Sequence, residues 1–407
     1  MLAYFKKNIY KDSLLNIIAS LILTIAVQGL AYPFLAFKFT ISEYGVILTI
    51  LGIINSVGIS LGNSLNNTRI LLQSEYDKKG LSGDYNILFI AILLIGSIGT
   101  GILTTITIQS VDWTVIGSIF ITILVMFRSY YTASFRIIID YKKIMYTSIW
   151  GFVGYIIGVI IMFFFQYWVI LFICGELFAC IYVFYSSKII HDKFRISNLF
   201  NKSLNKFTLI MFAAVISNLM MYMDRFYIYP LMGPEKVAVY TVASFLGKTV
   251  SIILTPIAGV LLTYYTKQEQ LDSKSFYKQT IIFSLVSFFI YIILIVVGIP
   301  ICRIFYPTLI DQALPYFYIG NLAAILFILG NIIQPSLLRF CETKWQLITQ
   351  VIYFVIYLIF GYFGMIKYEL YGFIYAIIIA NVFRIFIMLL VITLTLKQLK
   401  NNELMTS

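Results

Sequence analysis

Charged residues are scarce in this chain. Only 11% of its 407 residues are Asp, Glu, Lys or Arg, whereas 61% are hydrophobic. Soluble domains contain about 25% charged residues, and a chain this apolar could not cover itself with polar surface in water. A bilayer removes that requirement, because the outside of a membrane helix can be as apolar as its core. The composition therefore predicts an all-α polytopic membrane protein.

Residues that carry catalytic or metal chemistry are also sparse. The single histidine, His191, lies in a basic loop, and the four cysteines show no metal or redox spacing. No Walker loop, zinc triplet or glycine-rich dinucleotide turn is present. We therefore expect no cofactor, no metal and no enzyme activity, and we expect an ion gradient or the membrane potential, not ATP hydrolysis, to drive any transport.

The net charge of +12 could suggest a nucleic-acid partner. The basic residues, however, form short clusters between apolar runs instead of one basic face. Such clusters report membrane topology, so no nucleic-acid partner is expected.

Membrane spans need about 20 predominantly apolar residues, and the sequence contains twelve such runs. Their approximate limits are 14–37, 44–65, 86–108, 113–134, 146–165, 167–186, 207–230, 237–265, 279–300, 314–338, 346–366 and 370–396. If the N-terminus is cytoplasmic, 22 of the 29 lysines and arginines, Arg128 among them, fall in cytoplasmic segments. Four fall in external segments, as the positive-inside rule requires. This predicts a multi-pass membrane protein with both termini cytoplasmic.

The longest basic loop falls at the middle of the chain and divides the spans six and six. We therefore predict an N-terminal six-helix bundle (1–186), a cytoplasmic basic linker (187–206) and a C-terminal six-helix bundle (207–407). Since six is even, both bundles enter the membrane from the same side and form parallel repeats.

Polar residues recur at helical spacing inside three of these spans. They are Asn16, Ser20, Thr24 and Gln28 in the first span, Thr49, Gly52, Ser56, Ser60, Asn63 and Asn67 in and after the second, and Thr241, Ser244, Lys248, Ser251 and Thr255 in the eighth. Small and hydroxylated residues also mediate helix packing in lipid. Packing is the favoured interpretation for the first span, and a hydrated cavity for the second and eighth.

Ionisable residues inside spans are expensive and face a cavity or a partner instead of lipid. Glu176, Lys248 and Arg384 lie near the middle of their spans, and Asp224 and Arg225 lie near the end of the seventh. One interpretation is structural pairing, with Glu176 neutralising Lys248 or Arg384. The other is a cationic patch that meets an anionic substrate. Asp224 and Arg225 could instead reach the lipid headgroups.

A family resemblance rests on residues 223–228, Met-Asp-Arg-Phe-Tyr-Ile, and on the turn and helix that follow at 231–243. An Asp-Arg pair before a Leu-Gly turn and a Tyr-x-x-Ala helix resembles bacterial polysaccharide repeat-unit flippases. Residues 42–45, Ser-Glu-Tyr-Gly, echo this turn in the first half, with the two glutamates 192 residues apart. These flippases belong to the multidrug, oligosaccharidyl-lipid and polysaccharide exporter superfamily.

The resemblance implies two bundles that form a V-shaped, cationic central cavity. It implies a lipid-linked oligosaccharide substrate carried on undecaprenyl pyrophosphate, with Lys248, Arg384 and Arg225 facing the anionic groups. It also implies membrane lipids, a coupling Na⁺ or H⁺, a polysaccharide polymerase and a chain-length regulator as partners. Lipid II flippases usually carry two further spans and several arginines in the first two spans, whereas the first span here has no charge, which disfavours lipid II as the substrate.

Two other functions stay open. One is a drug or metabolite exporter of the same superfamily, coupled to sodium or protons. The other is a membrane polysaccharide polymerase, which the short external loops disfavour because glycosyl transfer needs an outward-facing site.

Overall fold

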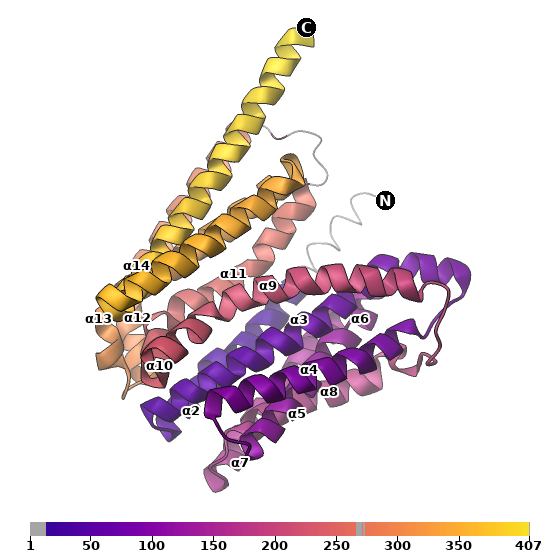
Figure 1. Cartoon of the computed structure of the whole chain (residues 1–407), viewed down its shortest axis with the longest axis vertical. Coiled ribbons are helices and arrows are strands. Elements are labelled where there is room, and N and C mark those ends of the chain that lie inside the picture. Colours follow the sequence, from indigo (N-terminus) through magenta and orange to yellow (C-terminus); the bar gives the residue numbers. More distant parts are fainter. Residues whose placement is uncertain (1–13, 266–270, 272, 407) are drawn as a thin grey trace. The chain divides into compact units, whose positions relative to one another are not determined.

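The computed structural model describes residues 14–265, 271 and 273–406, and within these it contains helices and no strands (Figure 1). Ten described helices are long and apolar enough to cross a membrane, or eleven when one bent pair counts as a span. The twelve predicted spans all fall on these helices, because the last helix, α14 (Thr343–Thr406), carries two of them. The prediction of an all-α polytopic membrane protein is confirmed.

Helix surfaces in the structure have the apolar character that lipid requires. Along α4 (Asp84–Ile108) large aliphatic side chains stay more than half exposed over most of the length. They are Leu94, Ile95, Ile98, Ile102 and Ile106. In water such a row would be costly, but against acyl chains it is neutral.

The chain forms two compact units, residues 1–237 and residues 238–407. In the first unit, the helix Leu14–Lys38, which includes η1 (Ile25–Ala31) and α2 (Tyr32–Lys38), precedes α3 and α4. The others are α5 (Trp113–Tyr131), α6 (Ala133–Ile137), α7 (Tyr141–Phe164), α8 (Val169–Ser186), η2 (Lys188–His191) and α9 (Phe200–Met232). The six-and-six division of domains stays a prediction.

The centre of the first unit is α3 (Ile41–Lys79), which packs against α4, α5 and α9 (Figure 1). Small residues let its neighbours come close. A Cβ at Gly62 would lie 2.6 Å from Cβ of Ser129, and one at Gly58 would lie 2.9 Å from Val125. Small residues at helix crossings are how membrane helices gain packing contacts.

The two turns that carry the family resemblance meet in the structure. The helix α3 begins with a capping box, in which Thr40 and Glu43 each bond the other's backbone N–H. A Cβ at Gly45 would lie 1.9 Å from the carbonyl oxygen of Pro234, so glycine is required there. The echo between the two sequence motifs therefore marks two helix starts in direct contact.

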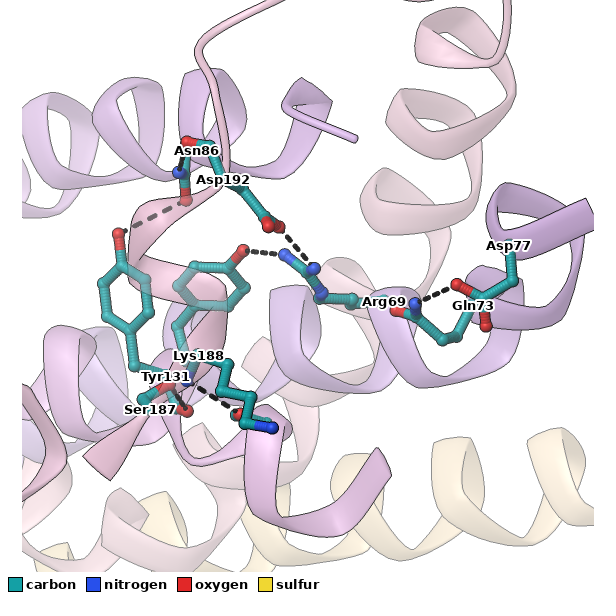
Figure 2. Close-up of polar contacts among 10 residues, drawn as sticks. Arg69, Gln73, Asp77, Asn86, Tyr131, Ser187, Lys188 and Asp192 are labelled. Atoms are coloured by element: carbon teal, nitrogen blue, oxygen red, sulfur yellow. Dashed lines mark hydrogen bonds and ion pairs between the residues drawn. The ribbon is translucent and has the colours of Figure 1, made fainter. Parts of the chain in front are cut away.

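Residues 187–206, the predicted linker, are packed onto the first unit. Arg69 forms an ion pair with Asp192 at 2.5 Å and donates to the Tyr130 hydroxyl at 3.0 Å (Figure 2). The amide of Asn86 donates to the carbonyl of Asp192 at 2.8 Å. Ile189, at 7% exposure, joins the core of the unit. The segment is thus a fixed part of this unit.

The second unit contains α11 (Phe245–Tyr265), α12 (Ser273–Phe305), α13 (Ile310–Phe340) and α14, and α10 (Pro234–Ala243) leads into it. The central helix is α13, which packs against α11, α12 and α14. The long α14 is broken at Tyr368 and Glu369, whose backbone angles are not helical. A Cβ at Gly372 would lie 2.0 Å from the carbonyl oxygen of Gly364, so the two arms meet backbone to backbone beside the break.

Candidate substrate-binding site

Arg225 is buried in the first unit between α9 and α3. Its Nη1 donates to the carbonyl oxygen of Leu48 at 2.7 Å, and its guanidinium lies 5.3 Å from the ring of Tyr222. Gly52 leaves the space for this side chain, since a Cβ there would be 3.3 Å from Cδ of Arg225. The neighbouring Asp224 is also buried. The alternative that this pair reaches the headgroups is therefore wrong for Arg225, which bonds an adjacent helix.

The polar face of α3 divides into a packed part and an open part. Thr49, Ser56 and Ser60 are buried, and the Ser60 hydroxyl lies 3.5 Å from the carbonyl of Ala214 in α9. Asn63, one turn further on, is exposed. Helix packing accounts for the first part, and the exposed amide leaves Asn63 available to a ligand.

Asn67, the last residue of that face, holds a basic side chain. Arg136 donates from Nη1 to the side-chain oxygens of both Asn66 and Asn67, each at 3.1 Å. The amide of Asn66 in turn donates to the carbonyl of Ser129 at 2.8 Å. Asn67 thus helps to fix an exposed arginine of α6 against α3.

Glu176 forms a buried ion pair with Arg128, a partner that sequence reasoning missed. Arg128 donates from Nε at 2.6 Å and from Nη2 at 3.1 Å to the two carboxylate oxygens (Glu176 on α8, Arg128 on α5). The prediction that Glu176 neutralises Lys248 or Arg384 is therefore wrong. Arg128, counted among the cytoplasmic charges in the sequence analysis, lies within α5, which continues past it to Tyr131.

In the second unit, Lys248 follows a break in the chain. The helices α10 and α11 are bent by 63° relative to each other, with Ser244 at the break. The Lys248 ammonium lies 4.8 Å from the ring of Tyr240, on the other side of the bend, and the side chain is half-buried. A cation over an aromatic face is stabilised by the ring quadrupole.

The other predicted polar residues of this span run from the bend along α11. Ser244 is buried and donates to the carbonyl of Tyr240 at 2.8 Å. Ser251 is buried, and Thr255 is exposed and donates to the carbonyl of Ser251 at 2.8 Å. The face thus changes from buried at the bend to exposed about three turns later.

Asn321 of α13 occupies the inside of the bend. Its side-chain oxygen accepts from the N–H of Gly247 at 2.7 Å, and its amide donates to the carbonyls of Ala243 at 2.9 Å and Phe317 at 2.8 Å. Asn321 is fully buried. Backbone groups at a helix break need partners in an apolar medium, and this one side chain supplies two of them.

Replacing Asn321 with alanine should destabilise the second unit. The N–H of Gly247 and the carbonyl of Ala243 would each lose a partner, at a cost of about 1–3 kcal/mol per buried group. Thermal unfolding in detergent measures the loss. Thr208→Ala is the control, because its hydroxyl bonds only a carbonyl of its own helix. Equal stability of the two variants would show that the bend does not depend on Asn321.

Arg384 is the most deeply placed cation of the second unit, at 3% exposure. Its Nη2 donates to the side-chain oxygens of Asn331 at 2.9 Å and Gln334 at 2.8 Å, both on α13. Its guanidinium carbon lies 5.3 Å from the ring of Tyr353 and 5.5 Å from that of Phe327. These partners are neutral, so among the described residues they orient the guanidinium without compensating its positive charge.

Aromatic rings form a continuous path between Lys248 and Arg384 in the second unit. Successive distances along it are 4.8, 5.7, 5.7, 6.2 and 5.3 Å, for the series Lys248, Tyr240, Phe373, Tyr357, Tyr353 and Arg384. The rings come from α10 and from both arms of α14. Edge-to-face contacts of this kind are favourable, so the path ties both cations to one packed aromatic core.

The predicted site residues therefore form separate groups. Lys248, Ser244, Ser251 and Thr255 share α11 and are linked to Arg384 through the aromatic path. Asp224 and Arg225 lie together on α9, and Glu176 lies apart from them with Arg128. The sequence analysis missed Asn321, Asn331 and Gln334, although amide side chains within apolar spans were a readable signal.

The class that this fold defines is a polytopic α-helical membrane protein with cations inside its helical units. No family model matches the sequence, and no curated protein matches it. Solved structures do. The chain matches an inward-facing multidrug resistance MATE family transporter of the MOP superfamily with a TM-score of 0.66 at 13% identity, covering 95% of this chain and 96% of that one.

Two further structures show the same fold. The chain matches the lipid II flippase MurJ in its inward closed conformation with a TM-score of 0.66 at 15% identity, covering 95% of this chain and 87% of that one. It matches a MATE protein in complex with MaD3S with a TM-score of 0.65 at 17% identity, covering 96% and 97%. The fold is thus that of MATE transporters and the MurJ flippase.

Proposed function

We propose that this protein is a flippase that moves undecaprenyl-pyrophosphate-linked oligosaccharide repeat units from the cytoplasmic to the outer leaflet. The product would supply capsule, O-antigen or exopolysaccharide assembly. The observation that carries the proposal is Arg384, a buried guanidinium whose described partners are two neutral amides and two aromatic rings. An uncompensated cation in an apolar unit is costly unless it meets an anion.

The charges inside the helices favour an anionic substrate. Within the twelve predicted spans, four residues are basic and two are acidic. They are Arg128, Arg225, Lys248 and Arg384, against Glu176 and Asp224. Arg128 already neutralises Glu176. The excess positive charge therefore comes from Arg225, Lys248 and Arg384, which outnumber Asp224. A pyrophosphate group complements that excess, and guanidinium groups bind phosphate oxygens in pairs.

The proposed roles follow from these positions. Arg384, oriented by Asn331 and Gln334, binds a phosphate oxygen through its remaining N–H groups. Lys248, beside the bend of α10 and α11, adds a second positive charge. The bend gives the helix a point where its direction can change, while the polyprenyl tail stays in the bilayer. Arg225, Asp224, Asn63 and Asn67 are proposed to line the path of the sugar headgroup.

The same proposal places the chain in the bacterial inner membrane with both termini cytoplasmic. It gives the protein membrane lipids as neighbours, a coupling Na⁺ or H⁺, and a polysaccharide polymerase and chain-length regulator as functional partners. The charge asymmetry of the loops and the family resemblance support these expectations.

A second candidate function is the export of a drug or metabolite coupled to sodium or protons. The observation that favours it is the fold, since the match to a multidrug resistance MATE family transporter is as good as the match to the flippase. The two functions differ in substrate charge and in attachment to lipid, and one assay can separate them.

Reconstitution tests the proposal directly. Purified protein in liposomes that hold a defined undecaprenyl-pyrophosphate oligosaccharide should make the sugar headgroup accessible to an impermeant reagent on the opposite side. Lys248→Ala should slow this exchange about tenfold or more, because charge-assisted bonds contribute about 1.5–3 kcal/mol. Uptake of a cationic dye with no headgroup exchange would instead support the exporter.

A further inference from the structure

Two loops of the first unit present large apolar side chains to the outside. Ile138 and Ile139, in the loop between α6 and α7, are 51% and 64% exposed. Phe194 and Ile196, in the loop before α9, are each 64% exposed. The segments that lead into these loops are joined, since the hydroxyl of Ser187 donates to the carbonyl of Tyr131 at 2.9 Å (Figure 2). We call these two loops the rim.

The rim is held in place from within the unit. Before Phe194, Asp192 is bonded by Arg69 and Asn86, and after Ile196 the N–H of Ser197 donates to Asp84 at 2.6 Å. Between these points the backbone of residues 193–195 packs directly against Gly83, since a Cβ at Gly83 would be 2.0 Å from the carbonyl oxygen of Lys193. The exposure of Phe194 and Ile196 is therefore built into the fold.

Ile139 shows the same feature in the other loop. Its φ is 57°, in the left-handed region that β-branched residues rarely adopt. A strained backbone that keeps an isoleucine exposed points to a functional contact at that position.

Basic side chains alternate with the apolar ones in the rim. Lys193 and Arg195 are exposed on either side of Phe194. The nearest acidic residue in this loop, Asp192, is already paired with Arg69. The outer surface of this loop is therefore apolar and positive, as in segments that lie on anionic membranes.

The rim also lies at the right depth. Gly83, which contacts the backbone of Lys193 and Arg195, immediately precedes α4. The apolar run of α4 is predicted to enter the membrane at about residue 86. The loop that carries Phe194 is thus about one helical turn from the residue at which this run is predicted to enter the acyl region.

We propose that the rim binds the anionic phospholipids of the leaflet next to it. Phe194 and Ile196 insert at the boundary between headgroups and acyl chains, Ile138 and Ile139 do the same beside them, and Lys193 and Arg195 contact the phosphates. The contact fixes the end of α9 against the membrane surface. This binding is separate from the flippase substrate and does not depend on it.

Tryptophan quenching by brominated lipids tests the proposal. The full-length F194W variant is placed in nanodiscs that contain either brominated phosphatidylglycerol or brominated phosphatidylcholine at equal mole fraction. The signal is the difference from the parent protein, which has four tryptophans. Ile98→Trp, in an exposed position well inside α4, is the matched control for acyl contact without headgroup selection. Ile196→Trp is the second probe if F194W is poorly inserted.

We expect quenching of F194W by both lipids, about twofold stronger with phosphatidylglycerol because each nearby basic residue attracts anionic headgroups. K193Q/R195Q in the F194W protein should remove that preference and keep the quenching. Ile98→Trp should be quenched equally by the two lipids. Absence of quenching at 194 and 196 would mean a solvated loop and would overturn the proposal. Equal quenching by both lipids would overturn its anionic specificity.

Discussion

Arg384→Ala should abolish surface polysaccharide in cells and headgroup exchange in liposomes, while the protein still inserts into the membrane. The substitution removes a cation that is 3% exposed and whose described partners are neutral amides and aromatic rings. The loss should be about ten- to a hundredfold in rate, as expected for charge-assisted hydrogen bonds to a phosphate. Exchange rates and the amount of protein in the membrane fraction are the two measurements.

Three further variants show whether the charge or the geometry of Arg384 is needed. Arg384→Lys keeps the charge but lacks the planar group that Asn331 and Gln334 orient, so it should retain only part of the activity. Asn331→Ala should have a smaller effect, because Gln334 still accepts from Nη2. The matched control is Arg303→Ala, an arginine of the same unit whose side chain is 63% exposed. Normal export by Arg384→Ala would refute the anion-binding role.

The ion pair between Arg128 and Glu176 should dominate the stability of the first unit. Glu176→Ala leaves the Arg128 guanidinium buried without its carboxylate, and breaking a buried pair in this way costs about 3–5 kcal/mol. A large loss of stability is expected because the glutamate side chain is only 7% exposed and two hydrogen bonds join the carboxylate to the guanidinium. Thermal unfolding of the purified protein measures the change.

Removing both charges should restore much of that loss. The double variant Arg128→Met with Glu176→Leu leaves no unpaired charge and keeps similar volume, and such replacements are often neutral. Glu75→Ala is the control, because Glu75 pairs with Lys202 at the exposed end of the unit, where ion pairs contribute about 0–1 kcal/mol. If Glu176→Ala were as stable as Glu75→Ala, the pair would have no structural role and a part in transport would follow.

The sequence predicted the helices better than their partners. Each predicted span has its helix because apolar length alone determines what can cross a bilayer. The same reasoning assigned Arg128 to the cytoplasmic end of its span and gave it no partner, since a single span contains no information about its neighbours. Only the contact between α5 and α8 shows that the guanidinium is buried against Glu176.

The spacing of polar residues along one helix predicted which face of that helix is polar, but not which neighbouring helix packs on that face. In α3, Ser60 lies against α9, whereas Asn63, one turn away, is exposed. In α11, the bend beside Ser244 depends on Asn321, which is 74 residues from Gly247 in sequence. A periodic pattern describes one helix by itself, so it contains no information about which neighbour packs on it.

By itself, the sequence determined that this protein is helical, that it lies in the membrane and where its spans fall, because lipid selects for apolar length and composition. The tertiary structure decided which of the deep charges are neutralised. In the structure Glu176 forms an ion pair with Arg128, whereas Arg384 is surrounded by amides and aromatic rings. The physical reason is that burial makes a charge expensive, and only the packing of distant helices determines whether a counter-charge is within reach.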